Sequence, residues 1–320
     1  MELTKMNATI MSKFGQSGAV FSFALMDLAA NNPDIVVLSS DMSTPAGLDR
    51  FKKAYPNRFY NIGIAEQNLV GIAAGLASEG WIPIIVAQAC FVTMRSFEQV
   101  RQYCGYMKLP IIIVGYGAGF SLQFMGNTHF SIEDIALMRS IPGMTVVSPA
   151  DASEAAKVIE AAIGYKQPIY IRLTDKLGCP IVYVSEYDYE IGKANVIQDG
   201  EEIQIIATGS MVSRAIKASS LLADDGIQAS LVNMHTLKPL DYKVIDKNAK
   251  LIVTIEEHNI INGLGSAVSD FLVLKEFRTH LLKIGVNDCF SQVGDYNYLL
   301  EQHGLTPEKI AESIKKQIKK

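Results

Sequence analysis

Charged residues are scarce in this sequence, and the scarcity excludes partners that are recognised mainly by charge. Asp, Glu, Lys and Arg make up only 19% of the 320 residues, and the formal net charge is −4. The basic residues are spread along the chain, so no stripe of the kind that neutralises phosphates is present. The terminal KKQIKK suits the last turn of a helix, where the macrodipole favours positive charge. We therefore expect no nucleic-acid partner.

Paired cysteines and long apolar runs are also lacking. The four cysteines, Cys90, Cys104, Cys179 and Cys289, show no CxxC spacing, so neither a disulfide nor a structural zinc site is predicted. No apolar run is long enough to span a bilayer, and the N-terminus lacks the pattern of a secretory signal. We expect a cytoplasmic protein with no membrane partner and no metal ligands of its own.

The short motifs of nucleotide and hydrolytic sites are missing as well. No P-loop, HExxH or GxSxG occurs, and GYGAGF has the spacing GxGxG, whereas the dinucleotide fingerprint is GxGxxG. ATGS and NGLGS each lie between an expected strand and an expected helix. Such loops can hold an anion, but they are also ordinary helix entries, with Ser210 and Ser266 as the expected N-caps.

The sequence does contain a regular alternation of strands and helices. Apolar, β-branched runs over 34–40, 81–89 and 109–117 are separated by helical stretches. This pattern is typical of a mainly parallel sheet covered on both faces. Polar and aromatic residues then interrupt the pattern, and a second, shorter alternation follows. We expect an α/β fold with two domains, 1–185 and 186–320.

One acidic residue stands out in YNIGIAEQNLVGIAAGLASEGW, which covers residues 60–81. Small and apolar residues from Ile64 to Ala77 predict a helix packed into a core, with Glu66 near its start. A carboxylate is favoured at a helix N-terminus by the macrodipole, so one interpretation is a simple first-turn acid. The other is a functional carboxylate in an apolar setting.

Three longer segments resemble, in the right order, the transketolases and related thiamine diphosphate enzymes. NIGIAEQNLVGIAAGLASEGWIPIIVAQACFVTMRSFEQVR is similar to their pyrimidine-binding segment, and GNTHFSIEDIALMRSIPGMTVVSPAD continues the likeness through the Thr-His turn. VTIEEHNIINGLGSAVSDFL resembles the signature of their C-terminal domain. The resemblance implies a pyrimidine-binding domain followed by a transketolase C-terminal-like domain.

The resemblance also implies thiamine diphosphate as cofactor and a chemical role for Glu66. The family glutamate at this position hydrogen-bonds N1′ of the aminopyrimidine and favours the tautomer whose N4′ takes the proton from the thiazolium C2. An apolar setting, here Ile64, Ala65 and Leu69, strengthens that hydrogen bond. Glu66 is therefore predicted to be catalytic and cofactor-binding.

The same likeness assigns Phe91, Phe97 and Asp41 to cofactor binding. Phe91 and Phe97 fall where the family stacks aromatic rings beside the aminopyrimidine, and Met94 lies between them. Core packing is the alternative for both rings. Asp41, in SSDMSTPAGLDRF, matches a turn of the family near the cofactor, although an Asp after a strand is also a common turn residue.

Histidines are the second group of candidates. His129, in GNTH, matches the family histidine that faces the reacting carbons, and we predict that it is catalytic; a lone histidine is otherwise most often structural. His258, in EEHN, is assigned to domain packing or to an interface.

Departures from the family pattern bear on the substrate. Gly117 stands where sugar-phosphate transketolases carry another histidine, and Met125 stands where they carry the aspartate that reads a donor hydroxyl. The arginine that grips the substrate phosphate is replaced by Asp175, unless Arg172 takes its part. These losses favour a modified, deoxy or non-phosphorylated sugar over an ordinary pentose phosphate.

The diphosphate and metal site of the family is missing altogether. Its GDG motif, followed some thirty residues later by Asn, does not occur, so the chain resembles the C-terminal subunit of a split transketolase. The resemblance implies a two-carbon ketol transfer between sugars, active only with an N-terminal partner subunit. That partner would hold the diphosphate and Mg²⁺ or Ca²⁺, and the expected assembly is α2β2.

Two other functions stay open on sequence grounds. The beta subunit of a 2-oxoacid dehydrogenase shares the two-domain plan and the glutamate, but the GNTHFSIEDIAL turn favours transketolase. A non-catalytic scaffold subunit would keep the fold without the chemistry, and the joint presence of Glu66, Phe91 and His129 speaks against it.

Overall fold

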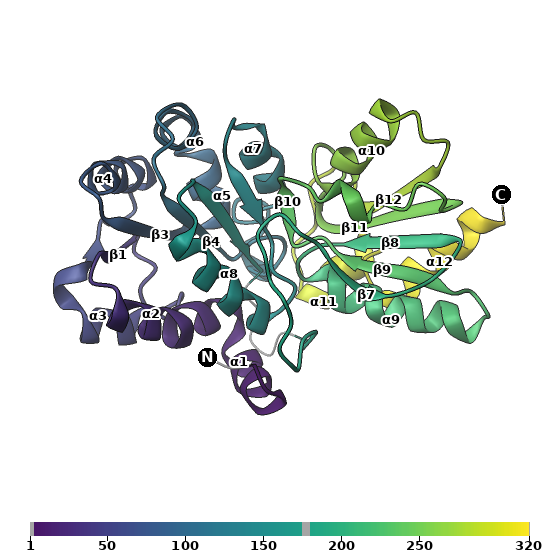
Figure 1. Cartoon of the computed structure of the whole chain (residues 1–320), viewed down its shortest axis with the longest axis horizontal. Helices are drawn as coiled ribbons and strands as arrows, with labels where there is room; N and C mark the ends of the chain where they lie inside the picture. The colour runs from purple at the N-terminus through teal and green to yellow at the C-terminus, as the bar shows by residue number, and fades with distance from the viewer. Residues whose placement is uncertain (1–2, 175–179, 320) are drawn as a thin grey trace.

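The computed structural model describes residues 3–174 and 180–319. Within them it shows two α/β units side by side, each a sheet with its helices, which we call the first layer and the C-terminal layer (Figure 1). The N-terminal part of the chain, purple to teal, builds one layer. The C-terminal part, green to yellow, builds the other. The expected α/β class is confirmed.

The first sheet has the strand order β10-β5-β6-β4-β3-β1-β2. Its central strands are β-branched runs such as IVVLS in β1, where every residue is buried. Strands that are apolar on both sides are what a parallel sheet between two helix layers requires. The strands are β1 (Ile35–Ser39), β2 (Phe59–Asn61), β3 (Ile82–Gln88), β4 (Ile112–Tyr116), β5 (Thr145–Val147), β6 (Ile169–Leu173) and β10 (Thr236–Lys238).

Helices cover both faces of this sheet because side chains alternate along each strand. In β1, Ile35 and Val37 belong to one core cluster, whereas Val36 and Leu38 belong to another. The first face packs against α1 (Lys5–Gly18), η1 (Ala19–Ala24), α2 (Leu25–Asn31), α3 (Asp49–Ala54) and α8 (Ala152–Gly164). The second packs against α4 (Glu66–Ser78), α5 (Ala89–Met94), α6 (Phe97–Val100), η3 (Arg101–Tyr106) and α7 (Asp134–Ser140).

The second sheet has the order β12-β11-β8-β9-β7, with β7 antiparallel to β9 at one edge. Helix α10 shares a core cluster with the first layer, whereas α9, α11 and α12 pack on the opposite face. The elements are β7 (Asn195–Gln198), β8 (Ile203–Ala207), α9 (Met211–Asp224), β9 (Ala229–Asn233), β11 (Leu251–Asn259), α10 (Leu264–Leu274), β12 (His280–Val286), α11 (Tyr296–Gln302) and α12 (Pro307–Ile318).

The two layers are joined by a shared strand and by buried polar contacts. Strand β10 comes from the C-terminal part of the chain but pairs antiparallel with β5 of the first sheet. Arg172, 2% exposed, donates from Nε to Asp134 Oδ2 at 2.8 Å and from Nη2 to the carbonyl of Glu257 at 2.9 Å. Tyr170 donates its hydroxyl to the same Asp134 oxygen at 2.7 Å. Strand β10 and the Arg172–Glu257 bond fasten the C-terminal layer to the first one, while Asp134 and Tyr170 hold Arg172 in place within the first one.

The two expected N-caps have different outcomes. Ser210 takes the N-cap position of α9, although its hydroxyl donates to Glu257 and makes no cap bond. The expectation for Ser266 was wrong, because Gly263 is the N-cap of α10. The buried carboxylate of Glu256 accepts the N–H groups of the next two residues at 2.7 and 2.8 Å, so it satisfies the helix end from the preceding strand.

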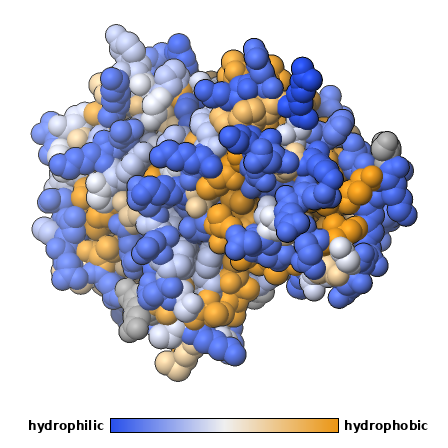
Figure 2. All heavy atoms as spheres, turned by 45° about the vertical axis from the view of Figure 1, so that its right-hand side comes forward, coloured by the Kyte–Doolittle hydropathy of each residue, from blue (hydrophilic) through white to orange (hydrophobic). Residues whose placement is uncertain are grey.

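The face of the molecule shown in Figure 2 is mostly polar. Figure 2 shows hydrophilic residues in blue over most of one face, with apolar residues in orange mainly in a central band. In residues 3–174 and 180–319, no helix is long and apolar enough to cross a membrane. Cys90 and Cys104 are buried free thiols and Cys289 is an exposed one, while Cys179 lies outside the described residues.

Candidate functional site

Glu66 is the first residue of α4, and its carboxylate lies at the rim of the first sheet. The chain leaves β2 at Asn61, turns at Gly63 with a φ of 80°, and enters the helix at Glu66. Glu66 is only 4% exposed, and Ser40 Oγ, at the end of β1, lies 3.2 Å from its Oε1. The small residues of α4 let the helix pack closely, which buries the carboxylate at its N-terminus.

Arg95 is the cationic partner of that carboxylate. Its Nη1 lies 3.2 Å from Oε2 and 3.4 Å from Oε1 of Glu66. The same guanidinium stacks over the ring of Phe91, 3.8 Å from the ring centroid. Arg95 follows Phe91 by four residues at the end of α5, and this spacing places the two side chains on one helix face.

Phe91 connects this ion pair to His129. The two ring centroids are 5.2 Å apart, and the planes meet edge to face at 67°. His129 sits in a tight turn whose backbone N–H donates to the carbonyl of Gly126 at 2.9 Å, and its Nδ1 is 2.9 Å from Thr128 Oγ1. Glu66, Arg95, Phe91 and His129 therefore form one continuous row.

A pocket of about 470 Å³ opens beside the row and is lined by residues 64–68 together with Arg95. The neighbouring thiol of Cys90 is not a nucleophile here, because burial raises its pKa to about 12. A buried carboxylate in a pocket wall, with an aromatic face and a histidine further along the same row, can hold a flat nitrogen-containing ring and exchange protons with it.

Asp41 and Phe97 lie outside this row. Asp41 is exposed in a left-handed turn with φ of 56°, where its backbone and carboxylate are tied to the side chain of Asn61 at 3.0 and 3.1 Å. Phe97 is half-buried and packs against the core cluster of α4 and β3. Their assignment to the cofactor stays a prediction.

Comparison with known families shows to which family the chain belongs. Residues 16–180 match the family model of the transketolase pyrimidine-binding domain, and residues 192–310 match that of the transketolase C-terminal domain. The chain belongs to the transketolase family.

Relatives of this transketolase-family chain include separate subunits of about its own length. It is 37% identical to a 6-deoxy-6-sulfo-D-fructose transketolase subunit of Clostridium sp. (strain MSTE9), with 89% of both chains covered. It is 35% identical to an apulose-4-phosphate transketolase subunit of Phocaeicola vulgatus, with 94% of this chain and 96% of that one covered. A solved structure described as a split-gene transketolase, inactive beta4 tetramer, superposes with a TM-score of 0.85 at 38% identity, covering 95% and 97% of the two chains. The chain is therefore a transketolase-like C-terminal subunit.

Of the positions where this chain departs from the sugar-phosphate pattern, Met125 lies beside the His129 turn and Gly117 follows β4. Phe124 and Met125 are 71% and 51% exposed, so they present apolar surface beside the turn. Arg172 is buried in its pair with Asp134 and cannot serve as a phosphate clamp. Asp175 lies outside the described residues.

His258 is a buried residue between packed elements, as expected for domain packing. It is fully buried, its Nδ1 lies 2.7 Å from the carbonyl of Asn259, and its Nε2 accepts the N–H of Ala136 at 3.4 Å. Burial lowers the pKa of His258 to about 4. The neutral ring thus bridges β11 and α7.

Sequence reasoning missed Arg95 and Ser40. The i, i+4 spacing from Phe91 to Arg95 was a usable signal for the stacking, but nothing local indicates that Arg95 reaches Glu66, 29 positions earlier. Ser40 precedes the candidate Asp41, and the structure places Ser40, rather than Asp41, against the carboxylate.

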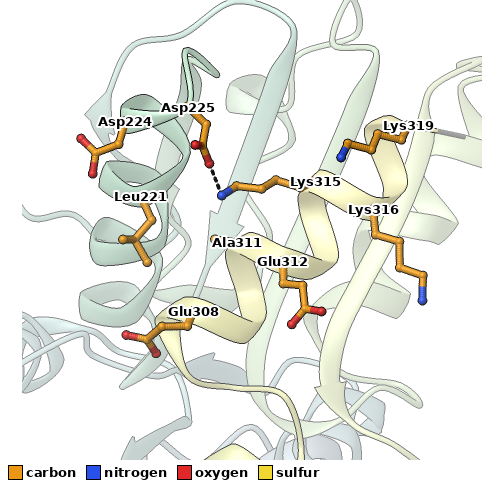
Figure 3. Close-up of a pocket in the computed structure, with 9 residues that line it drawn as sticks. All are labelled: Leu221, Asp224, Asp225, Glu308, Ala311, Glu312, Lys315, Lys316 and Lys319. Carbon is orange, nitrogen blue, oxygen red and sulfur yellow. Dashed lines mark ion pairs between the residues drawn. The ribbon is translucent and has the colours of Figure 1, made fainter.

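A cleft of larger volume, about 780 Å³, lies in the C-terminal layer between α9 and α12 (Figure 3). Its walls carry exposed charges, and Lys315 pairs with Asp225 across it. It has no aromatic wall, which makes it a poor site for a flat cofactor ring. Among residues 3–174 and 180–319, no group of three His, Cys, Asp or Glu side chains gathers to hold a metal ion.

Proposed function

We propose that this chain is the C-terminal subunit of a two-subunit, thiamine diphosphate-dependent transketolase that transfers a two-carbon ketol unit between sugars. The observation that supports this most strongly is the row that runs from Glu66, in a pocket wall, through Arg95 and Phe91 to His129. When bound, thiamine diphosphate supplies the carbon nucleophile that accepts and releases the ketol unit.

The residues fit the aminopyrimidine half of this cofactor. In the structure, a planar nitrogen group, the guanidinium of Arg95, already donates N–H groups to Glu66 and stacks on Phe91. An aminopyrimidine ring offers the same two features, a nitrogen edge and a flat face. Glu66 then holds a proton at N1′ of the ring, and Phe91 fixes the ring plane. Phe97 and Asp41 are proposed as outer contacts of the same half-site.

His129 is proposed to act on the substrate side of the row. Its Nδ1 lies 2.9 Å from Thr128 Oγ1, and in this proposal Nε2 is the nitrogen that faces the substrate. From there the imidazole can hydrogen-bond a sugar oxygen and hold or release its proton.

A partner subunit completes the proposed enzyme. The sequence has no GDG motif with a downstream Asn, so the N-terminal subunit would bind the diphosphate through Mg²⁺ or Ca²⁺. Relatives that match this chain end to end are themselves named as transketolase subunits, which supports the split. We propose an α2β2 assembly in the cytoplasm, with each site formed where the two subunits meet and no activity without the partner.

The substrate is proposed to be a non-standard sugar. Gly117 and Met125 stand where the sugar-phosphate pattern has a histidine and an aspartate, and the buried Arg172 leaves this strand without a phosphate clamp. The relatives named for 6-deoxy-6-sulfo-D-fructose and apulose 4-phosphate support a substrate outside the common pentose phosphates.

The test is ketol transfer by the native complex, purified through this chain and supplied with magnesium and thiamine diphosphate. Donor ketoses with phosphate, sulfonate or methyl ends are compared with xylulose 5-phosphate. We expect faster transfer from a non-standard donor, and a rate typical of central-metabolism enzymes on xylulose 5-phosphate would contradict the substrate proposal.

The variant Glu66→Gln isolates the role of the carboxylate. Gln keeps the size and an acceptor but cannot share a proton, so transfer should fall by roughly 10²- to 10⁴-fold while the partner still co-purifies. Glu79→Gln, at the exposed other end of α4, is the control and should retain activity.

Two other outcomes would replace the proposal. Unchanged activity in Glu66→Gln would favour a non-catalytic subunit. Pyruvate-dependent reduction of an artificial electron acceptor, without ketol transfer, would identify the beta subunit of a 2-oxoacid dehydrogenase.

A further inference from the structure

The turn that carries His129 belongs to a closed loop over residues 119–131. Gly119 and Ser131 exchange two backbone hydrogen bonds, at 2.9 and 3.1 Å, and so close its base. Between them, Phe124 and Met125 are exposed. Short-range backbone hydrogen bonds, such as those from Met125 N–H to Leu122 and from Gly126 N–H to Gln123, shape the far end of the loop. Contacts from outside the loop then fix its place, and with it that of His129, against the rest of the molecule.

The C-terminal layer holds the base of the loop. Glu257, at the end of β11, accepts the N–H of Phe120 through Oε1 at 2.7 Å. Arg172 donates from Nη2 both to the carbonyl of Ser131, at 3.0 Å, and to that of Glu257. The approach is close, because a Cβ added to Gly119 would lie 2.3 Å from Glu257 Oε1.

Asn127 ties the far end of the loop to the C-terminal layer, while Cys90 and Phe91 of α5 contact Thr128 and His129 from the first layer. Asn127 Nδ2 donates to the carbonyl of Ser291 at 2.8 Å, and its Oδ1 accepts the N–H of the same residue at 3.0 Å. The primary amide thus pairs with both polar groups of one backbone residue, 164 positions away in the sequence. No other residue type of similar size offers a donor and an acceptor side by side in this way.

Ser291 is itself held in place, so it can serve as an anchor. It is 8% exposed, and its hydroxyl lies 2.5 Å from Nε2 of His303. The His303 ring stacks on Phe120 with centroids 5.0 Å apart and planes at 13°. A Cβ on Gly126 would meet Val293 at 3.0 Å, so the two segments also touch beside the amide pair.

We propose that Asn127 is a positioning residue through which the C-terminal layer sets the orientation of His129. Asn127 lies two residues before His129, in the same turn, and its amide ties that turn to Ser291. This role deepens the proposed function, since it concerns the histidine of that same site. It gives the C-terminal layer a direct part in the active site.

The first test is hydrogen exchange of the full chain, which needs neither partner nor substrate. In Asn127→Ala, the turn amides of His129 and Phe130, both bonded to the carbonyl of Gly126, should exchange roughly 10-fold faster. Asn127→Asp keeps the acceptor but loses the donor, so its loop should exchange at an intermediate rate. Asn297→Ala removes an exposed asparagine from the neighbouring α11 and should leave the loop unchanged.

The second test is steady-state ketol transfer by the complex with its native partner. Misplacing a catalytic group lowers the rate of the chemical step, so Asn127→Ala should reduce kcat by roughly 10-fold and leave KM within about two-fold. Equal melting temperatures and equal recovery of the partner exclude a folding defect. Partial recovery of kcat in Asn127→Asp would match the graded exchange rates.

The outcomes separate this inference from the function on which it rests. Unchanged hydrogen exchange of the loop in Asn127→Ala would show that the Asn127–Ser291 contact, the clamp, does not hold the loop, whatever the activity. Faster exchange with unchanged kcat would overturn its part in the reaction. A wild-type complex without ketol transfer would defeat the proposed function and the role of the clamp in it, while exchange would still decide whether the clamp exists.

Discussion

Glu66–Arg95 and Asp134–Arg172 are the same kind of ion pair in opposite environments. The Arg95 side chain is 48% exposed, whereas the side chains of Arg172 and Asp134 are 2% and 0% exposed. Water reaches the Arg95 end of the first pair and can replace the contacts of that cation, although Glu66 is buried, whereas the second pair is closed to water on both sides. The first pair can therefore give way to a ligand, and the second holds Arg172 where its Nη2 reaches the carbonyl of Glu257 in the C-terminal layer.

The largest expected effect comes from breaking the buried pair. Arg172→Ala leaves the carboxylate of Asp134 buried without a cation, and it also removes the donor that joins Ser131 to Glu257. We expect the free energy of unfolding to fall by about 3–5 kcal/mol, measured by urea denaturation. Lys193→Ala, which breaks an exposed pair with Glu190, should leave the urea midpoint unchanged. Equal midpoints for the two variants would contradict the comparison.

A second effect concerns pH and the buried carboxylate of Glu154, where α8 meets Asn233 of β9. Burial raises the pKa of Glu154 to about 8. An acid whose folded pKa is raised keeps its proton in the native state after the unfolded chain has lost it, so stability falls as pH rises towards that value. Burial lowers the pKa values of His235 and His258 to about 4. Below about pH 6.5 the unfolded chain therefore binds protons that the native state does not bind, so these two histidines make stability rise with pH there.

Between pH 6.5 and 8, the carboxylates Glu154 and Glu256 change the stability with pH, whereas His235 and His258 do not. Glu256, whose pKa burial raises to about 7, contributes at the lower end of this window. We expect the wild type to lose about 2 kcal/mol of stability over the window and Glu154→Gln to lose much less, measured by urea denaturation at each pH. Parallel curves for the two proteins would show that Glu154 does not titrate there.

The smallest effect should come from opening the Glu66–Arg95 pair. Arg95→Leu removes the cation that occupies Glu66 and the face of Phe91, so the complex should bind thiamine diphosphate up to about 10-fold more tightly, the range expected for an exposed ion pair with a cation–π contact. Isothermal titration calorimetry gives the Kd without turnover. Arg101→Leu, an exposed arginine on the adjacent η3, is the control. Weaker cofactor binding in Arg95→Leu would mean that Arg95 assists the cofactor instead of competing with it.

Much of the fold was predictable because its signals are local. The runs in β1 and β3 are apolar enough to require burial on both faces, and the small residues after Glu66 predict the closely packed helix α4. The likeness around NIGIAEQN and GNTH indicated Glu66 and His129 because those residues stand inside continuous motifs. Ser266 shows where this reasoning ends, since its helix is capped by a carboxylate from another element.

Sequence alone determined the alternation of strands and helices, the family likeness and the candidates Glu66, Phe91 and His129. Only the tertiary structure decided that β10 joins the first sheet, that Arg95 covers Glu66, and that Asn127 grips Ser291. The physical reason is that periodicity and capping act within one or two turns of chain. Pairing across 29 or 164 positions depends on how whole layers pack, and no short stretch of sequence encodes it.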